Sequence, residues 1–500
     1  MLFLCILFII HFYKQIILNN VFVKSGNNVY NLYAIAYWKN DYSQRVRSLA
    51  SQFPKISEFR FLKLSPPQIL VLGFASIILL GALLLMLPIS STSGQSIPFI
   101  DALFTSTSAT CVTGLVVMDT GTSFTIFGKI VIMVLIQIGG LGFMTMATLF
   151  ALVLKRRISL RDRLILQEAM NQNTMEGIVR LIRRVLIYSL VIEGTAAALL
   201  SFRWAFDMPL GRAVFFGMFH AVSMFNNAGF DIFGDYRSLT GYVSDPLVNI
   251  VVMFLIITGG IGFIVMVDLV EYREKRRLSL HSKVVLSMTA ALILIGTLVI
   301  FIFEFTNPQT LGPLNFGSKI LASFFQSVTP RTAGANTVDI AGLRQASQFF
   351  MVILMFIGAS PGSTGGGIKT TTFTIMIGAV IAMLRGREDI VLFRYRLAQE
   401  RIFKALTVTL LALLLIVSVS MVLSTTEDRN FLMILFETTS AFATVGLSMG
   451  LTPELSLIGK ILICLTMFAG RLGLLTLAYA LGPKQGKPLY KYPEGKIIIG

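Results

Sequence analysis

Long apolar segments alternate with short charged ones along most of the chain. Eight of these segments, all after residue 64, hold about 20 or more residues, the length that a helix needs to cross a hydrocarbon core about 30 Å thick. The pattern predicts an all-α polytopic membrane protein with eight transmembrane spans, the sixth of which is interrupted by a glycine-rich stretch. The predicted spans lie near 66–88, 125–154, 183–202, 246–270, 284–303, 346–384, 405–424 and 455–481.

Four connections between the predicted spans are themselves apolar, and they are similar to one another. They read FTSTSATCVTGL, FHAVSMFNNAGF, FFQSVTPRTAGA and FETTSAFATVGL. Each has a phenylalanine ten positions before its glycine, and three have a serine six positions before it, with Val328 as the exception. These windows predict four tandem repeats of a helix, a half-helix, a pore loop and a helix, with pseudo-fourfold symmetry about an axis normal to the membrane. The phenylalanine and glycine pairs are Phe104 and Gly114, Phe219 and Gly229, Phe324 and Gly334, and Phe436 and Gly446.

A second set of glycines follows 24 to 30 residues after the first. Its members are Gly139, Gly259, Gly358 and Gly470. In the fourth copy Arg471 stands where the others have Gly140, Gly260 and Ala359. A charge inside an apolar span is costly, so it indicates either a functional site or a buried pair. For Arg471 a salt bridge to Glu437 is the structural alternative, and Glu193 in the third span is assigned to an internal structural pair.

The glycine loops have a physical use at membrane depth. Non-helical backbone is tolerated there only where protein or water surrounds it, so the four loops must share a central cavity. Their carbonyl oxygens can then replace the hydration shell of a cation, and the negative C-terminal ends of the half-helices favour a cation over an anion. The alternative is that the glycines serve only helix packing. Four glycines in register favour the filter.

Composition agrees with a membrane protein, since 55% of the 500 residues are hydrophobic and 13% are charged. The formal net charge of +17 does not indicate nucleic-acid binding, because Lys and Arg cluster in every second connection and in both tails. Positive connections stay on the cytoplasmic side, so both termini and the connections around 155–184, 271–283 and 385–404 are predicted to be cytoplasmic. This topology and attraction to anionic lipid explain most of the charge. Docking of a partner is the second interpretation.

Residues that carry catalysis or bind metals are scattered. Neither the three cysteines nor the three histidines have metal-ligand spacing, and no acid, base or nucleophile arrangement recurs with them. We expect no enzyme activity, no cofactor, no zinc site and no disulfide, and we expect His220 to be packed rather than reactive. The residues concerned are Cys5, Cys111, Cys464, His11, His220 and His281.

The stretch GSTGGGIKT is similar to a phosphate-binding loop at first sight. Such a loop needs an adjacent glycine and lysine, and here Ile368 separates Gly367 from Lys369. No soluble βαβ unit precedes it. The sequence therefore argues against a membrane NTPase.

The four glycine windows, with LSPPQILVLGF, GASPGSTGGGIKTTTF and the ending YPEGKIIIG, resemble the membrane subunit of the Trk/Ktr/HKT superfamily of potassium transporters, and most of all its KtrB type. The likeness extends from about Leu64 to Gly500. It implies selectivity for potassium, since serine at the first glycine accompanies sodium selectivity in that superfamily and this chain has Gly114. The potassium-binding residues that it implies are Val112, Thr113, Gly114, Asn227, Ala228, Gly229, Thr332, Ala333, Gly334, Thr444, Val445 and Gly446.

The resemblance also implies a means of control. In the resembled family the intramembrane loop, here 358–373, is the gate, and an arginine within the pore, here Arg471, is an electrostatic barrier to cations. The implied gating residues are Gly358, Ser360, Pro361, Gly362, Ser363, Thr364, Gly365, Gly366, Gly367 and Lys369.

The function implied is potassium uptake by the translocating subunit of a sodium-dependent Ktr-type system. The resemblance implies a homodimer in the plasma (cell inner) membrane, docked on a cytoplasmic nucleotide-binding regulatory ring of the KtrA type. The transported ion would be K+, with Na+ as a coupling or activating ion. A sodium or ammonium conductor of the same fold, and an assembly protein without transport, are the alternatives.

The predicted organisation has six parts. The extension at 1–63 is cytoplasmic or peripheral, and its apolar start, Met1–Ile10, is too short to span a membrane. Pore repeats follow at 64–157, at 158–278 with its cytoplasmic connection, at 279–388 with the loop 358–373, and at 389–484. The tail is 485–500.

Overall fold

The computed structural model describes residues 65–142, 145, 165, 178–387, 389–482, 490 and 493. All of them belong to one unit, Ser65–Gly500. The predicted extension at 1–63, the basic residues at 155–163 and most of the tail at 485–500 lie outside the described residues.

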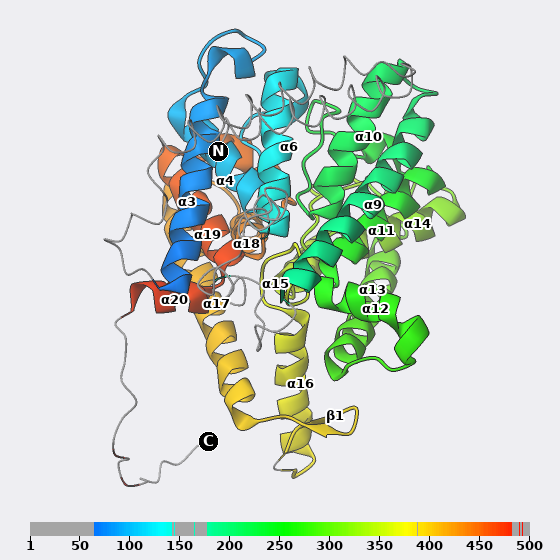
Figure 1. The fold of residues 1–500 in the computed structure, drawn as a ribbon. Coiled ribbons are helices and arrows are strands. Elements are labelled where there is room, and N and C mark those ends of the chain that lie inside the picture. Colours follow the sequence, from blue (N-terminus) through cyan, green and yellow to red (C-terminus); the bar gives the residue numbers. More distant parts are fainter. Residues whose placement is uncertain are drawn as a thin grey trace, which may run out of the picture. The chain divides into compact units, whose positions relative to one another are not determined.

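Four long helices are each followed by a half-helix and then by a third helix (Figure 1). The long helices are α3 (Pro66–Leu85), α9 (Ile178–Trp204), α13 (Leu280–Glu304) and α17 (Gln399–Thr426). The half-helices are α4 (Phe99–Thr110), α10 (Leu210–Phe225), α14 (Phe316–Val328) and α18 (Phe431–Ala443). The third helices are α6 (Ile126–Leu141), α11 (Pro246–Gly260), α15 (Gln345–Phe356) and α19 (Leu457–Leu472).

Shorter elements complete the described chain. Three helices extend the third helices beyond a break, namely α12 (Phe263–Lys275), α16 (Thr370–Leu384) and α20 (Leu474–Leu481). An antiparallel hairpin of β1 (Val391–Leu392) and β2 (Tyr395–Arg396) joins α16 to α17. The one-turn helices are α5 (Thr120–Ser123), η2 (Pro88–Ser90), η3 (Thr240–Tyr242) and η4 (Thr452–Glu454).

The third helices are broken at more places than the sequence predicted. Helices α11 and α12 meet at 102°, and α19 and α20 meet at 96°. Three of the breaks fall on the last residue of GGLG, GGIG and GRLG, where Gly142, Gly262 and Gly473 have φ of 83°, 95° and 83°. A right-handed helix cannot continue through such a residue. The predicted interruption of the sixth span is present between α15 and α16, whereas the breaks in the other third helices were not predicted.

By length and composition, four described helices are long and apolar enough to cross a membrane, or six if each bent pair counts as one span. These four are the long helices α3, α9, α13 and α17. The predominantly helical, membrane-type architecture is confirmed. The count of eight spans stays a prediction.

Several helices begin where the sequence supplies a capping side chain. Asn315 Oδ1 accepts a hydrogen bond from the Ser318 amide at 2.8 Å at the start of α14. Asp245 Oδ1 accepts from the amide of Leu247 at 3.0 Å at the start of α11. Pro246 is the first residue of that helix, where a missing N–H costs nothing.

The helices contact one another in a closed cycle. Each half-helix packs on the long helix before it, as in α3 with α4 and α9 with α10. Each third helix also packs on the half-helix of the next unit, so that α6 contacts α10, α11 contacts α14, α15 contacts α18 and α19 contacts α4. The last of these contacts includes an ion pair at 2.7 Å between Lys460 Nζ and Asp101 Oδ1. The fourth unit is thereby joined to the first.

A buried carboxylate fixes the corner between α13 and α15. Glu304 is fully buried, and its oxygens accept hydrogen bonds from Asn307 Nδ2 at 2.6 Å and Thr310 Oγ1 at 2.7 Å. They also accept from the Arg344 amide at 2.9 Å and Ser347 Oγ at 2.5 Å. Four donors replace the water that the carboxylate loses on burial.

His220 is packed among aromatic rings, as predicted. Its ring is fully buried, with centroids 4.7 Å from Phe233 and 5.0 Å from Trp204. Its Nδ1 lies 2.8 Å from the Phe216 carbonyl oxygen. Among the described residues, Cys111 and Cys464 are free thiols buried in the structure.

Candidate functional site

The four predicted filter glycines follow the half-helices in one shared backbone conformation. Gly114, Gly229, Gly334 and Gly446 have φ of 95°, 68°, 77° and 90°. The residue two positions before each is also left-handed, although none is a glycine. These residues are Val112, Asn227, Thr332 and Thr444, with φ of 58°, 57°, 70° and 51°. Such conformations are costly outside glycine, so their occurrence in all four windows indicates a shared constraint. We call 112–114, 227–229, 332–334 and 444–446 the glycine segments.

The glycine segments contact one another in a ring. A Cβ added to Gly114 would lie under 3.0 Å from the Ala228 carbonyl oxygen, and one added to Gly229 would meet that of Ala333 equally closely. In the same way Gly334 faces the carbonyl of Val445, and Gly446 faces that of Thr113, which closes the ring. Only glycine fits at these four positions. Each of the carbonyls of Thr113, Ala228, Ala333 and Val445 thus lies against the glycine of a neighbouring unit.

The serine of the sequence pattern joins the half-helix to its glycine segment. Ser108 Oγ accepts a hydrogen bond from the Gly114 amide, and Ser440 Oγ accepts one from the Gly446 amide, both at 3.1 Å. In the second unit Ser223 Oγ instead donates to the Phe230 carbonyl at 2.7 Å. The third unit has Val328 at this position, and Thr329 takes over by donating from Oγ1 to the Ala335 carbonyl.

The second set of glycines serves close packing. A Cβ on Gly139, Gly259 or Gly470 would lie under 3.0 Å from a carbonyl oxygen at the C-terminal end of a half-helix. The carbonyls are those of Thr110, Phe225 and Phe442. Gly358 differs, because its nearest neighbour is the Gly366 carbonyl of its own loop. Three of these four glycines therefore allow a third helix to pack tightly against the end of a half-helix.

The loop between α15 and α16 lies against three of the glycine segments. Thr364 Oγ1 donates to Asn227 Oδ1 at 3.0 Å. A Cβ on Gly365 would lie under 3.0 Å from Thr332 Oγ1, and one on Gly366 equally close to Thr444 Oγ1. The loop thus touches the left-handed residues of the second, third and fourth units.

Backbone and side-chain hydrogen bonds hold this loop in place. The Ser360 amide donates to the Gly260 carbonyl at 3.0 Å, and the Phe263 amide donates to the Gly362 carbonyl at 2.8 Å. Lys369 Nζ donates to the Gly365 carbonyl at 2.7 Å. Its other contacts are Ser363 Oγ with the Ser360 carbonyl at 2.6 Å, Ser360 Oγ with Thr370 Oγ1 at 2.9 Å, and Lys369 Nζ with the Gly366 carbonyl at 3.2 Å. Pro361 lies at the break between α11 and α12, with its carbonyl facing Gly262.

Arg471 joins the loop to the first unit. Its guanidinium donates to the carbonyls of Thr364 and Gly139, and to that of Gly140 at 3.0 Å. Within the described ranges no carboxylate pairs with it. Glu437 instead accepts hydrogen bonds from Ser448 Oγ at 2.8 Å and from Thr452 Oγ1. The alternative of a salt bridge between Arg471 and Glu437 is therefore wrong.

The side-chain contacts of two groups near the glycine segments were not predicted. Asn227 bridges units through its side chain, donating from Nδ2 to Thr332 Oγ1 at 3.3 Å while accepting from Thr364. Glu193, predicted to form an internal pair, has its carboxylate oxygens 3.1 and 3.2 Å from Gln137 Nε2. Neither contact could be predicted from the sequence, because the partners lie in different units.

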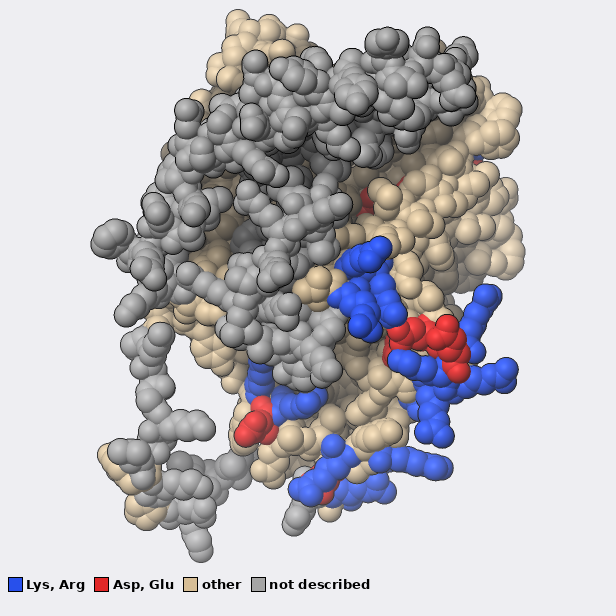
Figure 2. All heavy atoms as spheres, in the orientation of Figure 1, with Lys and Arg blue, Asp and Glu red and all other residues tan. Residues whose placement is uncertain are grey.

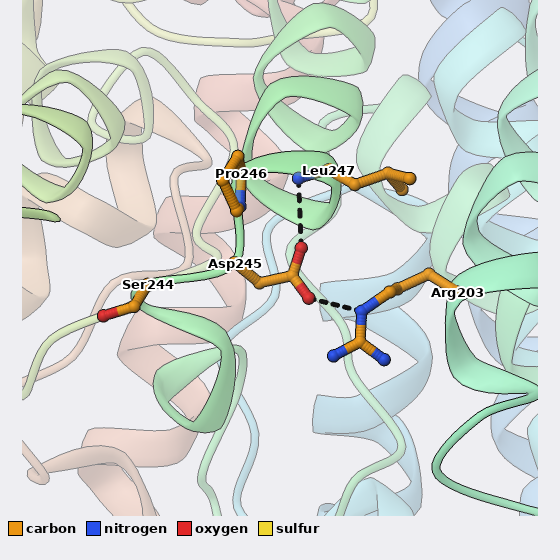
Figure 3. A pocket seen from close by; sticks show the side chains of 5 residues that line it. All are labelled: Arg203, Ser244, Asp245, Pro246 and Leu247. Carbon is orange, nitrogen blue, oxygen red and sulfur yellow. Dashed lines mark hydrogen bonds and ion pairs between the residues drawn. The ribbon is translucent and has the colours of Figure 1, made fainter. Parts of the chain in front are cut away.

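A surface pocket lies apart from these residues. It is lined by Arg203, Ser244, Asp245, Pro246 and Leu247, with a volume of about 630 Å³ (Figure 3). Arg203 Nε donates to Asp245 Oδ2 at 2.5 Å, so the charges in the pocket neutralise each other. No residue predicted for the site lines it.

Basic side chains gather at one end of the described unit. Figure 2 shows Lys and Arg on the lower part of the drawn face. Arg273, Arg276, Arg277, Arg394 and Arg396 are exposed. Glu271 partly neutralises this surface by accepting from Lys275 Nζ at 2.6 Å and from Arg184. Hydrogen bonds from Lys275 and Arg184 hold the pKa of this carboxyl below its usual value.

Comparison with known proteins places the chain among transporters. A family model described as cation transport protein, TrkH, matches residues 65–484. The Ktr system potassium uptake protein B of Bacillus subtilis is 47% identical over 441 residues, which cover 88% of this chain and 98% of that protein. The potassium/sodium uptake protein NtpJ of Enterococcus hirae is 43% identical over 444 residues, covering 88% and 98%.

A solved structure shares the fold. The crystal structure of the potassium transporter TrkH from Vibrio parahaemolyticus matches with a TM-score of 0.66 at 18% identity, over 85% of this chain and 86% of that one. The family match confirms the prediction of a transporter in place of an enzyme. It covers both the closed cycle of helices and the four glycine segments. The chain belongs to the TrkH family of cation transport proteins.

Proposed function

We propose that the chain is the ion-translocating subunit of a Ktr-type potassium uptake system in the plasma membrane, with both termini cytoplasmic. The observation that carries this proposal is the closed ring of glycine segments, in which each of four main-chain carbonyls lies against the glycine of a neighbouring unit. We propose that these four carbonyls converge on one pore axis. Two curated relatives above 40% identity carry names of potassium uptake proteins, which supports potassium as the cargo.

The pore is proposed to have pseudo-fourfold symmetry, with the axis through the ring of glycine segments. The cyclic contacts of third helices with half-helices support this arrangement. Eight spans follow if each long helix and each broken third helix crosses the membrane once. The break at Gly262 is compatible with crossing, because it lies against the Pro361 carbonyl of the third unit rather than in lipid.

The filter is proposed to bind a dehydrated cation through the carbonyls of residues Val112 to Gly114 and their counterparts in the other segments. Each carbonyl oxygen takes the place of a water oxygen in the hydration shell. The half-helices end directly at the ring, so their partial negative charges lower the energy of a cation there. An anion would meet the same charges with the opposite sign and be rejected.

The loop 358–373 is proposed to be the gate. It lies against Asn227, Thr332 and Thr444, which immediately precede the converging carbonyls. An ion leaving the filter on that side meets the loop. Its glycines allow the backbone to move once its hydrogen bonds with Gly260, Phe263 and Asn227 break.

Arg471 is proposed to act as an electrostatic barrier and as a latch on the gate. All of its hydrogen-bond partners in the described residues are carbonyls, so its positive charge is not neutralised by an acid. A cation passing the loop meets that charge. Arg471 also holds Thr364, so movement of the loop requires this contact to break.

The assembly is proposed to be a homodimer on a cytoplasmic nucleotide-binding ring of the KtrA type. The exposed basic side chains near α12 and the β1–β2 hairpin support docking at that end of the molecule. Sodium dependence is part of the proposal, and the name of the Enterococcus hirae relative, a potassium/sodium uptake protein, is compatible with it.

Rubidium uptake into proteoliposomes tests the function directly. The purified chain, with its ring partner, should take up rubidium above empty liposomes, and external K+ should compete better than Na+ or ammonium. Gly114→Ser, which adds a hydroxymethyl group facing Ala228, should weaken the preference for K+ over Na+. Stronger competition by Na+ or ammonium in the parent chain would favour the alternative conductor. No uptake above empty liposomes would refute transport by this chain.

A further inference from the structure

Glu193 is a buried carboxylate without a cationic partner among the described residues. It lies midway along α9 and is 7% exposed. Its oxygens are contacted by side-chain amides, Gln137 Nε2 at 3.1 and 3.2 Å and Asn226 Nδ2 at 3.3 Å. Burying such a group costs free energy unless its acceptors are used, so the amides stabilise it there.

The two amides come from different helices and meet at the end of a half-helix. Gln137 lies on α6, in the first unit, and Asn226 caps the C-terminus of α10, in the second. Asn226 Nδ2 donates to Gln137 Oε1 at 2.7 Å and to the Val222 carbonyl at 2.9 Å. Asn227, the first residue of the second glycine segment, follows directly.

The carboxylate determines the direction of these hydrogen bonds. It can only accept, so Gln137 must turn its NH₂ group toward Glu193 and its oxygen toward Asn226. Asn226 is held from the other side as well, since its Oδ1 lies where a Cβ on Gly140 would be. The last turn of α10 is thereby fixed against α6, one residue before the left-handed backbone of Asn227.

We propose that Glu193 is a positioning residue for ion selectivity, which sets the place of the second glycine segment through Gln137 and Asn226. The inference rests on the proposed function, since it assigns the segment to the filter. Glu193 lies outside the ring and touches no ion. It sets the position of the Ala228 carbonyl relative to the carbonyls of the other three glycine segments.

The test compares Glu193→Gln with Glu304→Gln in the full-length protein with its ring partner. Both amides contact Glu193 Oε1, and Gln137 Nε2 also contacts Oε2. Glutamine at 193 keeps one acceptor oxygen and places an NH₂ group beside the Gln137 NH₂, so Gln137 loses one of its two contacts and two donors face each other. We expect the KM for rubidium to rise about 10- to 150-fold if the whole cost of one lost hydrogen bond to a charged group appears in ion affinity, and the preference for K+ over Na+ to fall. Glu304→Gln removes a buried carboxylate that has more and shorter hydrogen bonds but lies at the α13–α15 corner. It should leave KM and preference unchanged.

Exchanging the side chains at positions 137 and 193 tests whether the defect of Glu193→Gln can be rescued. In the double variant Glu193→Gln and Gln137→Glu, the carboxylate moves to α6, where it can accept from Asn226 and from the amide introduced on α9. KM and selectivity should return toward the parent values, which a merely structural loss would not do. Unchanged KM and preference in Glu193→Gln, or no rescue by the swap, would overturn the proposal.

Potassium-dependent thermal stabilisation of the purified protein separates the two proposals. The parent chain should be stabilised by K+, and Glu193→Gln should need a higher K+ concentration for the same shift in Tm. A parent that shows neither uptake nor stabilisation by K+ refutes the proposed function, and the inference with it. A parent that transports while Glu193→Gln behaves identically refutes the inference alone.

Discussion

Replacing Gly446 by alanine tests whether the ring of glycine segments is the ion-binding site. Gly446 has φ of 90°, and a Cβ there would lie under 3.0 Å from the Thr113 carbonyl oxygen. The left-handed backbone costs a non-glycine residue roughly 1–2 kcal/mol. The added methyl group costs about 1–3 kcal/mol more through overpacking. The two free-energy costs of Gly446→Ala together come to about 2–5 kcal/mol. The steric part arises because the Thr113 carbonyl must move to accommodate the methyl group.

Gly450→Ala is the matched control for this change. Gly450 has φ of 94°, and no atom lies within 4 Å of an added Cβ. It therefore carries the backbone cost without the clash. The difference between the two variants isolates the steric term of about 1–3 kcal/mol.

Rubidium uptake and thermal unfolding measure the outcome. If the whole steric cost appears in ion affinity, KM rises about 5- to 150-fold in Gly446→Ala relative to Gly450→Ala. The preference for K+ over Na+ should fall with it, since the Thr113 carbonyl no longer sits at its place in the ring. Equal KM and equal ion preference in the two variants, at equal expression, would refute the assignment of the glycine segments as a filter.

Three further changes test the loop 358–373 as the gate, Arg471 as the barrier, and the buried carboxyl group of Asp231. Deleting Gly362 to Gly367 should give uptake that no longer depends on the ring partner, and uptake that stays regulated would exclude the loop as the gate. Arg471→Gln removes a positive charge and at least one charged hydrogen bond, about 1.5–3 kcal/mol, so the maximal uptake rate should rise, and a folded variant with no higher rate would argue against a barrier. Burial raises the pKa of Asp231 to about 7 against a hydrogen bond from the Phe233 amide, which lowers it. Because the folded state disfavours the ionised form, stability should fall as pH rises from about 4 to 7. The gain in Tm of Asp231→Asn over the parent should therefore grow over that window, and a gain independent of pH would contradict the shift.

The sequence predicted the elements of the site better than their contacts. The serine six positions before the glycine was a reliable signal because it bonds within its own window, as Ser108 does with Gly114. Helix breaks at Gly142, Gly262 and Gly473 were missed, since glycine inside an apolar run is also typical of helix packing in membranes. Only the backbone conformation of such a glycine distinguishes a helix break from helix packing.

Contacts between units could not be read from the chain. Arg471 was assigned either a free charge or an acidic partner, whereas it binds carbonyls of Thr364 and Gly139. Every residue carries a carbonyl, so no residue type marks such a partner. The closed ring of glycine segments could not be predicted for the same reason, because its contacts are between main-chain atoms of residues more than 100 positions apart.

The third unit departs from the other three at the serine position and at the second glycine, and the departure at the second glycine has a physical consequence. Val328 replaces the serine that ties a half-helix to its glycine segment, and Gly358 packs on Gly366 of its own loop instead of on the end of a half-helix. In the other units the second glycine holds the third helix tightly against a half-helix carbonyl. Here the loop occupies that contact, so it can leave without pulling a half-helix out of the ring. In the other units the helix continues past the second glycine and breaks only at Gly142, Gly262 and Gly473. An interruption that began at the second glycine itself would there break the packing that holds a glycine segment in position. The exceptions within the repeat therefore favour this unit as the one that carries the gate.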